Sequence, residues 1–225
     1  MLITQHDILV WLHILAMVYW LGGEWGVFQS SYNVANPKLP LDERRRHMET
    51  AYRIDILART GIILLLPLGL HMGYNLGAQP WGGSFLVVVW LLTVGWLVLT
   101  WSAFIKRETD TGVTLTLWDE RIRYLLIPLL AGVAILSLLR GSPFTQDWYA
   151  TKVLLYAFAL VIGLGLRFIM RHWTLIFREL AVATGEARPA LEARLSRELA
   201  MGRGMAYVYW ITIGSIALLG VAKPF

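Results

Sequence analysis

The stretch VWLHILAMVYWLGGEWG, residues 10 to 26, decides the fold because it belongs to an apolar block of the length that crosses a bilayer. Blocks of similar length recur along the 225 residues, of which 57% are hydrophobic and only 16% charged. A soluble domain is normally nearer a quarter charged. We therefore predict an all-α, polytopic membrane helix bundle that forms a single transmembrane domain over residues 1–225.

The distribution of basic residues predicts the orientation of this bundle. Six transmembrane helices are predicted, at about 7–29, 54–76, 85–105, 123–140, 149–172 and 205–222. Lysines and arginines concentrate in the segments 30–53, 106–123 and 167–203. The positive-inside rule places these segments in the cytoplasm and both termini in the periplasm. We expect a multi-pass protein of a bacterial inner membrane.

A short helix is predicted in the last basic segment, where residues 189–201 read PALEARLSRELAM. Leu191, Leu195 and Leu199 recur every fourth residue and leave arginines on the other faces, which predicts an amphipathic cytoplasmic helix. Such a helix would lie on the membrane surface or pack as a solvated helix on the bundle, and the sequence leaves both open.

Two histidines, His13 and His71, have matching depths on the first two predicted spans. These spans run in opposite directions, and at about 1.5 Å of rise per residue both histidines lie roughly 8–9 Å below the outer surface. Two imidazoles at one depth on adjacent helices can hold a flat metal macrocycle between them. The alternative is that each histidine makes only an interhelical hydrogen bond.

Haem b is the cofactor that this pattern favours, because haem iron accepts two axial imidazoles in electron-transfer centres. The chain has no cysteine, which excludes covalently attached c-type haem, iron–sulfur clusters and thiolate metal sites. Lys152 and Arg140, expected at the outer ends of the fifth and fourth spans, could pair with the haem propionates.

A polar cluster of Glu24, Asp55 and Arg59 is predicted near the cytoplasmic boundary. Glu24 lies about 16 Å deeper than His13 on nearly the same helical face, and Arg59 lies at a similar depth on the second span. Asp55 precedes Arg59 by four residues, a spacing that allows an ion pair along one helix. Two interpretations remain open: a proton path or headgroup site, and an ion network that locks the helices.

Two segments resemble known membrane families. LHILAMVYWLGG, residues 12 to 23, resembles the first helix of the membrane haem-b protoporphyrinogen oxidases, which implies that His13 is a haem ligand. DWYATKVLLYAFALVIGLGLRF, residues 147 to 168, is similar to the lysine-bearing helix of that family and more so to the corresponding helix of CopD-like copper-resistance membrane proteins. Lys152 and Arg167 stand at its basic positions. The resemblance implies a shared membrane scaffold with a haem site and leaves the activity open.

Electron transfer by a b-type haem protein is the function that we prefer from the sequence. Its partners besides the lipid bilayer would be a periplasmic redox protein or another membrane subunit, with quinone as a further candidate. The alternatives are a porphyrinogen-oxidising enzyme, a CopD-like copper transport protein that uses Met17 and Met72 beside the histidines, and a structural subunit of a larger complex. No nucleic acid partner is expected, because topology and anionic lipid explain the basic loops.

Overall fold

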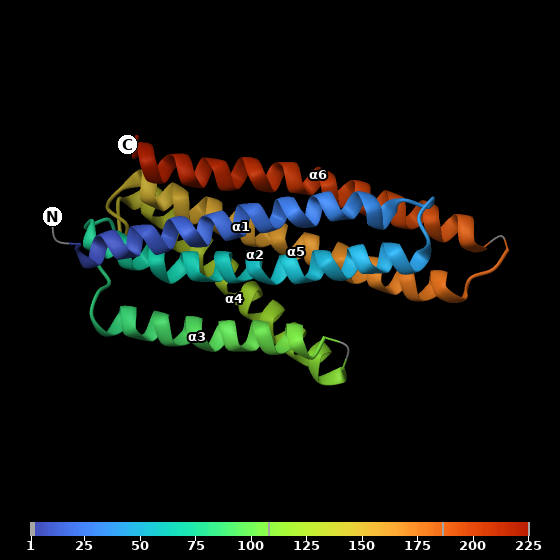
Figure 1. Ribbon diagram of the computed structural model, residues 1–225. Coiled ribbons are helices and arrows are strands. Elements are labelled where there is room, and N and C mark those ends of the chain that lie inside the picture. The colour runs from blue at the N-terminus through green and yellow to red at the C-terminus, as the bar shows by residue number, and fades with distance from the viewer. Residues whose placement is uncertain (1–2, 108, 186, 225) are drawn as a thin grey trace.

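Six long helices make up the fold. The computed structural model describes residues 3–107, 109–185 and 187–224, and in this part of the chain it contains helices and connecting turns without strands. Figure 1 shows the helices side by side, with both chain termini at one end of the molecule, which we call the terminal end. The helices are α1 (Gln5–Ala35), α2 (Leu41–Asn75), α3 (Ser84–Ile105), α4 (Asp110–Arg140), α5 (Asp147–Val182) and α6 (Ala187–Ala222).

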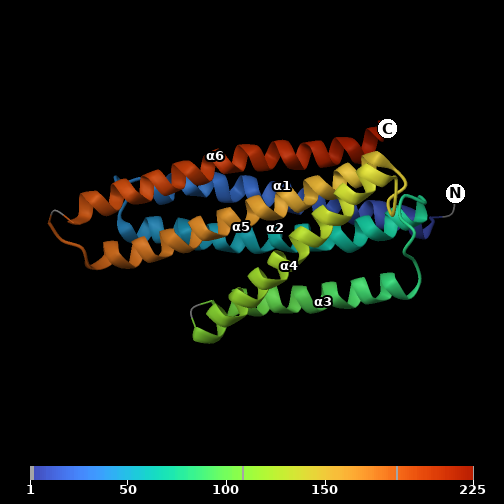
Figure 2. The ribbon, with the colours of Figure 1, turned by 180° about the vertical axis from the view of Figure 1, so that it is seen from behind.

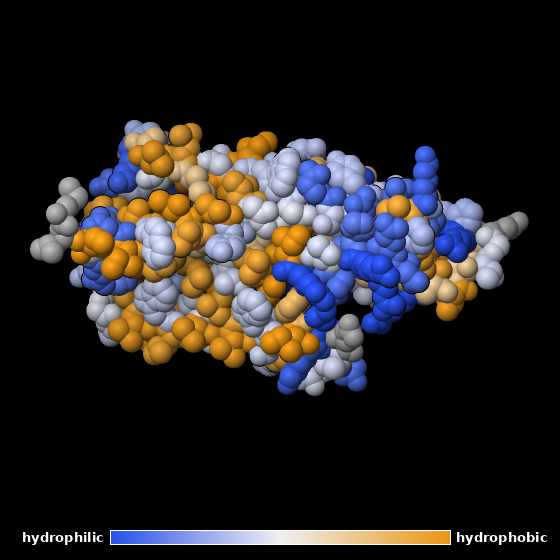
Figure 3. Space-filling model, in the orientation of Figure 1, coloured by the Kyte–Doolittle hydropathy of each residue, from blue (hydrophilic) through white to orange (hydrophobic). Residues whose placement is uncertain are grey.

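All six helices are long and apolar enough to cross a membrane, as the sequence predicted. The shortest, α3, has 22 residues, which at about 1.5 Å each corresponds to roughly 33 Å, close to the thickness of a bilayer core. Figure 3 shows hydrophobic residues over the part of the molecule that contains the terminal end, and hydrophilic residues toward the opposite end. A multi-pass protein in a lipid bilayer follows from this surface and these helix lengths.

Five helices, α1, α2, α4, α5 and α6, are clearly longer than the spans predicted for them, and four of these form a feature that the sequence did not reveal. The stem is our name for the part of α1, α2, α5 and α6 that surrounds a second apolar core away from the terminal end, and it is visible at the right of Figure 1. Helices α5 and α6 each have 36 residues, so both extend well beyond a bilayer core. Apolar periodicity located the membrane part of each helix but missed the stem, because the stem exposes polar residues outside lipid. The buried residues of its core are Val34, Met48, Ala51, Met170, Trp173, Ile176, Phe177, Leu180, Leu195 and Leu199.

The predicted amphipathic segment 189–201 is part of the stem. It forms the first turns of α6 and continues without a break into the last membrane helix, so it is not a separate helix on the membrane surface. Leu195 and Leu199 are buried in the stem core. The arginine Arg44, which is 1% exposed, donates hydrogen bonds of 2.7 and 2.8 Å to the two carboxylate oxygens of Glu192. Packing and this bidentate ion pair therefore fix α6 against α2 in the stem.

Helices α1 and α2 approach each other closely because small residues line their contact. A Cβ atom added to Gly23 would lie 2.7 Å from the Cβ of Ala58, and one added to Gly61 would lie 2.9 Å from the backbone nitrogen of Trp20. Any larger side chain at either glycine would push the two helices apart. This contact fixes the position of Trp20 in the bundle interior, where the side chain is 1% exposed.

Helices α3 and α4 flank the other four. Viewed from behind, α4 crosses diagonally from the end of α3 toward α5, as Figure 2 shows. The lipid-facing side of α3 is strongly apolar, with Leu91 66% and Leu92 69% exposed. Side chains of α1, α2, α5 and α6 meet around two cavities in the interior that these helices enclose.

Candidate functional site: two cavities in one helix bundle

An apolar cavity lies between α1, α2, α5 and α6 near the terminal end. We call it the terminal cavity; it has a volume of about 240 Å³. Its walls are almost entirely hydrophobic, with Tyr149 and Tyr156 of α5 among the few polar groups. Those two hydroxyls are already engaged, because they donate to the carbonyls of Gly69 and Ile62 at 3.2 and 2.7 Å. The groups left to interact with a ligand are His13 and Lys152.

His13 lines the terminal cavity from α1. A Cβ atom added to Gly69 would lie 3.7 Å from Cε1 of His13. The absence of a side chain at Gly69 therefore leaves space beside the imidazole. The Nδ1 atom of His13 is buried and has no hydrogen-bond partner among the described residues. An unpaired buried nitrogen costs about 1–3 kcal/mol, and a ligand or metal at the imidazole would offset that cost.

Lys152 faces the same cavity from α5. A Cβ atom added to Gly220 of α6 would lie only 2.5 Å from Nζ of Lys152. The glycine therefore leaves room for the ammonium group at this cavity. Within residues 3–107, 109–185 and 187–224, Lys152 has neither a salt bridge nor a hydrogen bond to another side chain. The terminal cavity thus offers one neutral nitrogen ligand and one cation within apolar walls.

The structure does not bring His71 to His13. His71 is absent from the lining of the terminal cavity, and its Nδ1 accepts a hydrogen bond of 3.4 Å from Nε1 of Trp90 on α3. Gly69, which faces His13, precedes His71 by two residues, and two residues correspond to about 200° around a helix. His71 therefore points away from the side of α2 that faces His13. The predicted arrangement of paired imidazoles around one macrocycle is not found.

Arg140 also lies apart from the cavity. It is exposed in the last turn of α4 and is not part of the cavity lining. Of the four residues predicted for a haem site, His13 and Lys152 share one cavity, whereas His71 and Arg140 do not reach it.

An aromatic layer separates the terminal cavity from a second cavity. Trp20 of α1 donates a hydrogen bond of 3.1 Å from Nε1 to the hydroxyl of Tyr209 on α6. The Trp20 ring lies edge-on to Tyr209 and Tyr156, with centroids 5.5 and 6.5 Å apart. Trp20 and Tyr156 line the terminal cavity, and Tyr209 lines the next one.

The second cavity, which we call the charged cavity, lies on the stem side of this layer and has a volume of about 70 Å³. Glu24, Asp55 and Arg59, which the sequence grouped near one boundary, all line it. Asp55 and Arg59 form an ion pair along α2, four residues apart. Glu24 stands eleven residues after His13 on α1, so one face of α1 carries a polar group into each cavity.

A buried ion network supports the charged cavity from α4. Asp119 is 1% exposed and accepts hydrogen bonds from Nε1 of Trp96 at 2.6 Å and Oγ1 of Thr100 at 3.0 Å. It also accepts from Nε of Arg123 at 3.3 Å and forms an ion pair with Arg167 of α5. This network links α3, α4 and α5 through buried side chains.

The sequence did not reveal this network, because the fourth span was predicted to begin at residue 123 and residues 106–123 were treated as a loop. The structure begins α4 at Asp110, so Asp119 and Arg123 lie within a continuous helix. The one signal present in the sequence was the four-residue spacing of Asp119 and Arg123, which suits an ion pair on a helix.

The remaining donor groups are few. Among the residues that the structure describes, no group of three or more histidine, aspartate and glutamate side chains could hold a metal ion. Met17 and Met72 line the terminal cavity together with His13, so two thioether sulfurs and one imidazole share it.

Comparison with protein families, with curated proteins and with solved structures found no match to this chain.

Proposed function

We propose that this chain is a membrane haem b protein that transfers electrons, with the haem in the terminal cavity. The observation that carries the proposal is the pairing of His13, whose buried Nδ1 has no partner, with the unpaired ammonium of Lys152 inside apolar walls. A haem combines an iron that accepts imidazole, a flat apolar ring and anionic propionates. These three features match the three kinds of group that the cavity offers.

Each group that lines the cavity would have a separate role toward the haem. His13 supplies the axial nitrogen, and Lys152 pairs with a propionate carboxylate. The hydrophobic walls exclude water, which is one of the factors that set a redox potential. When bound, the haem supplies one-electron chemistry. His71, which accepts from Trp90, has no part in this site, so the proposal differs from the bis-histidine arrangement that the sequence predicted.

The direct test is a reduced-minus-oxidised visible spectrum of the purified protein. We expect a b-type haem signal and extraction of non-covalently bound haem into acidified organic solvent. A protein that is folded, purified in the presence of added haemin and free of a haem spectrum would contradict the proposal.

Copper binding is the second candidate, and the specific observation in its favour is that His13, Met17 and Met72 share the terminal cavity. Thioether and imidazole groups are ligands that copper(I) accepts. The ammonium of Lys152 in the same apolar space opposes a bare cation and favours a ligand with carboxylates. Metal analysis of the purified protein decides between the two, because stoichiometric copper without haem would favour transport.

We infer that the stem lies in the cytoplasm and that both termini face the periplasm of an inner membrane. The support is the concentration of arginines in the segments that form and join the stem, including residues 30–53 and 167–203. A C-terminal fusion to a reporter that is active only in the periplasm tests this orientation. We expect activity from a fusion after residue 222 and none from a fusion within the α5–α6 connection.

A further inference from the structure

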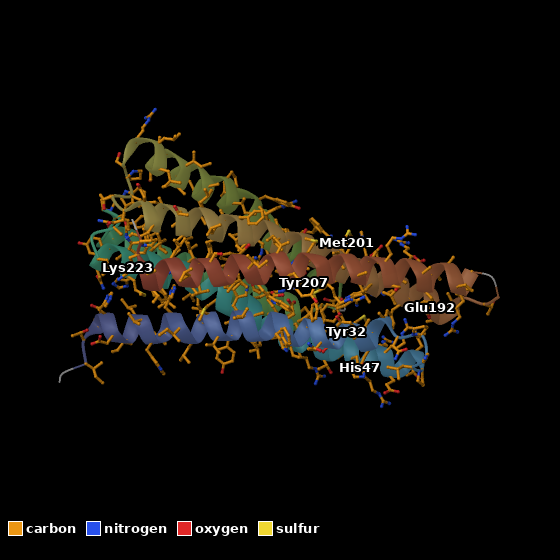
Figure 4. The ribbon with its side chains drawn as sticks, turned by 90° about the horizontal axis from the view of Figure 1, so that it is seen from above. Tyr32, His47, Glu192, Met201, Tyr207 and Lys223 are labelled. Carbon is orange, nitrogen blue, oxygen red and sulfur yellow. The ribbon has the colours of Figure 1, made fainter. Side chains whose placement is uncertain are left out.

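The seam between α1 and α6 beside the charged cavity is built from aromatic side chains. Phe28 is buried at its centre, with ring centroids 4.8 Å from Trp210, 5.5 Å from Tyr207 and 5.4 Å from Tyr32. Trp25 lies 4.9 Å from Trp210. Figure 4 looks onto this seam, with Tyr32 of α1 and Tyr207 of α6 on its two sides. A flat ring entering from lipid would meet aromatic surfaces here.

Two hydrogen-bond donors on the α6 side of the seam have no acceptor. Nη1 of Arg203 is buried without a hydrogen-bond partner in the described part of the chain, and so is Nε1 of Trp210. The guanidinium of Arg203 lies 4.7 Å over the ring of Tyr32 and lines the charged cavity. Guanidinium and indole nitrogens only donate, and an unpaired buried donor is costly. The missing groups are therefore acceptor oxygens.

Arg203 differs in this respect from the other arginines of the charged cavity. Arg59 pairs with an aspartate on its own helix, and Arg123 and Arg167 share the carboxylate of Asp119. Arg203 forms no ion pair with any residue that the structure describes. The ion network thus gives three arginines a carboxylate partner, although Nη1 of Arg167 also lacks a hydrogen bond among the described residues, and it leaves Arg203 at the seam without a carboxylate.

We propose that the seam and the charged cavity bind the headgroup of a lipid-soluble quinone. Arg203 and Trp210 are seven residues apart on α6, which places them on one face of the helix. Phe28 of α1 packs against that face. A quinone carries acceptor oxygens on opposite edges of a flat ring, so each donor receives one oxygen and the ring packs against the seam aromatics. An interfacial belt of aromatic residues would explain exposed rings but not two unpaired buried donors.

A phospholipid phosphate is the other source of acceptor oxygens in a bilayer. It has no flat ring to pack against the aromatic seam. The quinone is therefore the better match. This site stands independently of the cofactor proposed for the terminal cavity, because the two cavities lie on opposite sides of the Trp20–Tyr209 layer.

The test is a titration of the whole purified protein, in nanodiscs of zwitterionic lipid, with a benzoquinone that carries a decyl chain. Quenching of tryptophan fluorescence reports binding, and the half-saturating concentration is compared among variants. Arg203→Gln removes the charge, and Trp210→Phe removes the indole N–H while keeping a ring. Arg197→Gln is the matched control, because Arg197 is an exposed arginine on the same helix.

We expect saturable quenching, a half-saturating concentration raised about tenfold or more in Arg203→Gln and in Trp210→Phe, and no change in Arg197→Gln. If Arg203→Gln does not fold, Trp210→Phe carries the test. Non-saturable quenching, or equal affinity in wild type and Trp210→Phe, overturns the proposal. Loss of quinone binding in nanodiscs of anionic phosphatidylglycerol also overturns it, because an anionic lipid headgroup then occupies the site.

Discussion

The terminal cavity and the charged cavity are enclosed by the same helices and differ in how their polar groups are satisfied. In the charged cavity Arg59, Arg123 and Arg167 all have carboxylate partners. In the terminal cavity neither His13 nor Lys152 has a side-chain partner among the described residues. Paired charges at membrane depth hold helices together, whereas unpaired groups in an apolar cavity are available to a ligand. The terminal cavity therefore leaves its polar residues available for binding, whereas the charged cavity combines paired groups that hold helices together with the unpaired Arg203 at the seam.

The largest effect should come from breaking the ion network. Asp119→Ala leaves the buried guanidiniums of Arg123 and Arg167 without their shared carboxylate, and we expect a loss of about 3–5 kcal/mol in the free energy of unfolding. Unfolding of the detergent-solubilised protein in increasing fractions of a denaturing detergent measures this loss. Asp110→Ala, at an exposed position in the same helix, is the control. A change of the same size in both variants would contradict a special role for the network.

The next largest loss of unfolding stability should come from a larger side chain beside the aromatic layer between the cavities. Gly61→Val places a branched side chain against the backbone of α1 next to Trp20, and overpacking of this kind costs about 1–3 kcal/mol. We expect lower unfolding stability together with altered tryptophan fluorescence, because Trp20 must move. Gly95→Val is the matched control, since no atom lies within 4 Å of a Cβ at Gly95. Similar stability of the two valine variants would show that the close contact of α1 and α2 is unimportant.

Removing the cation of the terminal cavity should have a moderate effect. In Lys152→Met the haem loses a charged partner for a propionate, and we expect haem affinity to fall about tenfold, or about 1.4 kcal/mol. Competition with apomyoglobin for bound haem measures the affinity. Lys223→Met, which changes a lysine at the same end of the bundle but outside the cavity lining, should leave haem affinity unchanged. An unaltered affinity in Lys152→Met would remove Lys152 from the site.

The smallest effect should come from the hydrogen bond that joins the two sides of the aromatic layer. Tyr209→Phe leaves Nε1 of Trp20 without its acceptor while keeping the ring, and we expect a loss of about 1 kcal/mol in unfolding free energy. The haem spectrum should persist, because Tyr209 does not line the terminal cavity. Loss of haem in this variant would mean that the two cavities are coupled.

The sequence could predict the number of helices and the depth of polar groups, but not the directions in which side chains point. Depth follows from a fixed rise per residue, and Glu24, Asp55 and Arg59, which were predicted at one level, all line one cavity. The direction of a side chain around its helix depends on which helices pack beside it. His71 was expected beside His13 on depth alone, and the structure places it against Trp90 of α3 instead.

The limits of the helices were predicted less well than their existence. Hydropathy marks the segment of a helix that lies in lipid, and it gives no signal where the same helix continues into water. For this reason the continuous α6 was read as an amphipathic segment followed by a separate span. Asp119 was read as a loop residue because charged residues lower the hydropathy of the first turns of α4, although Trp96, Thr100 and Arg167 surround its carboxylate.

The most direct test of the account compares glycine substitutions of the two histidines. We predict that His13→Gly loses the b-type haem spectrum and that added imidazole restores it, because the small ligand can occupy the space that the side chain leaves. We predict that His71→Gly keeps the spectrum and does not respond to imidazole. Retention of the spectrum in His13→Gly, or its loss in His71→Gly with recovery on addition of imidazole, would contradict the assignment of haem to the terminal cavity.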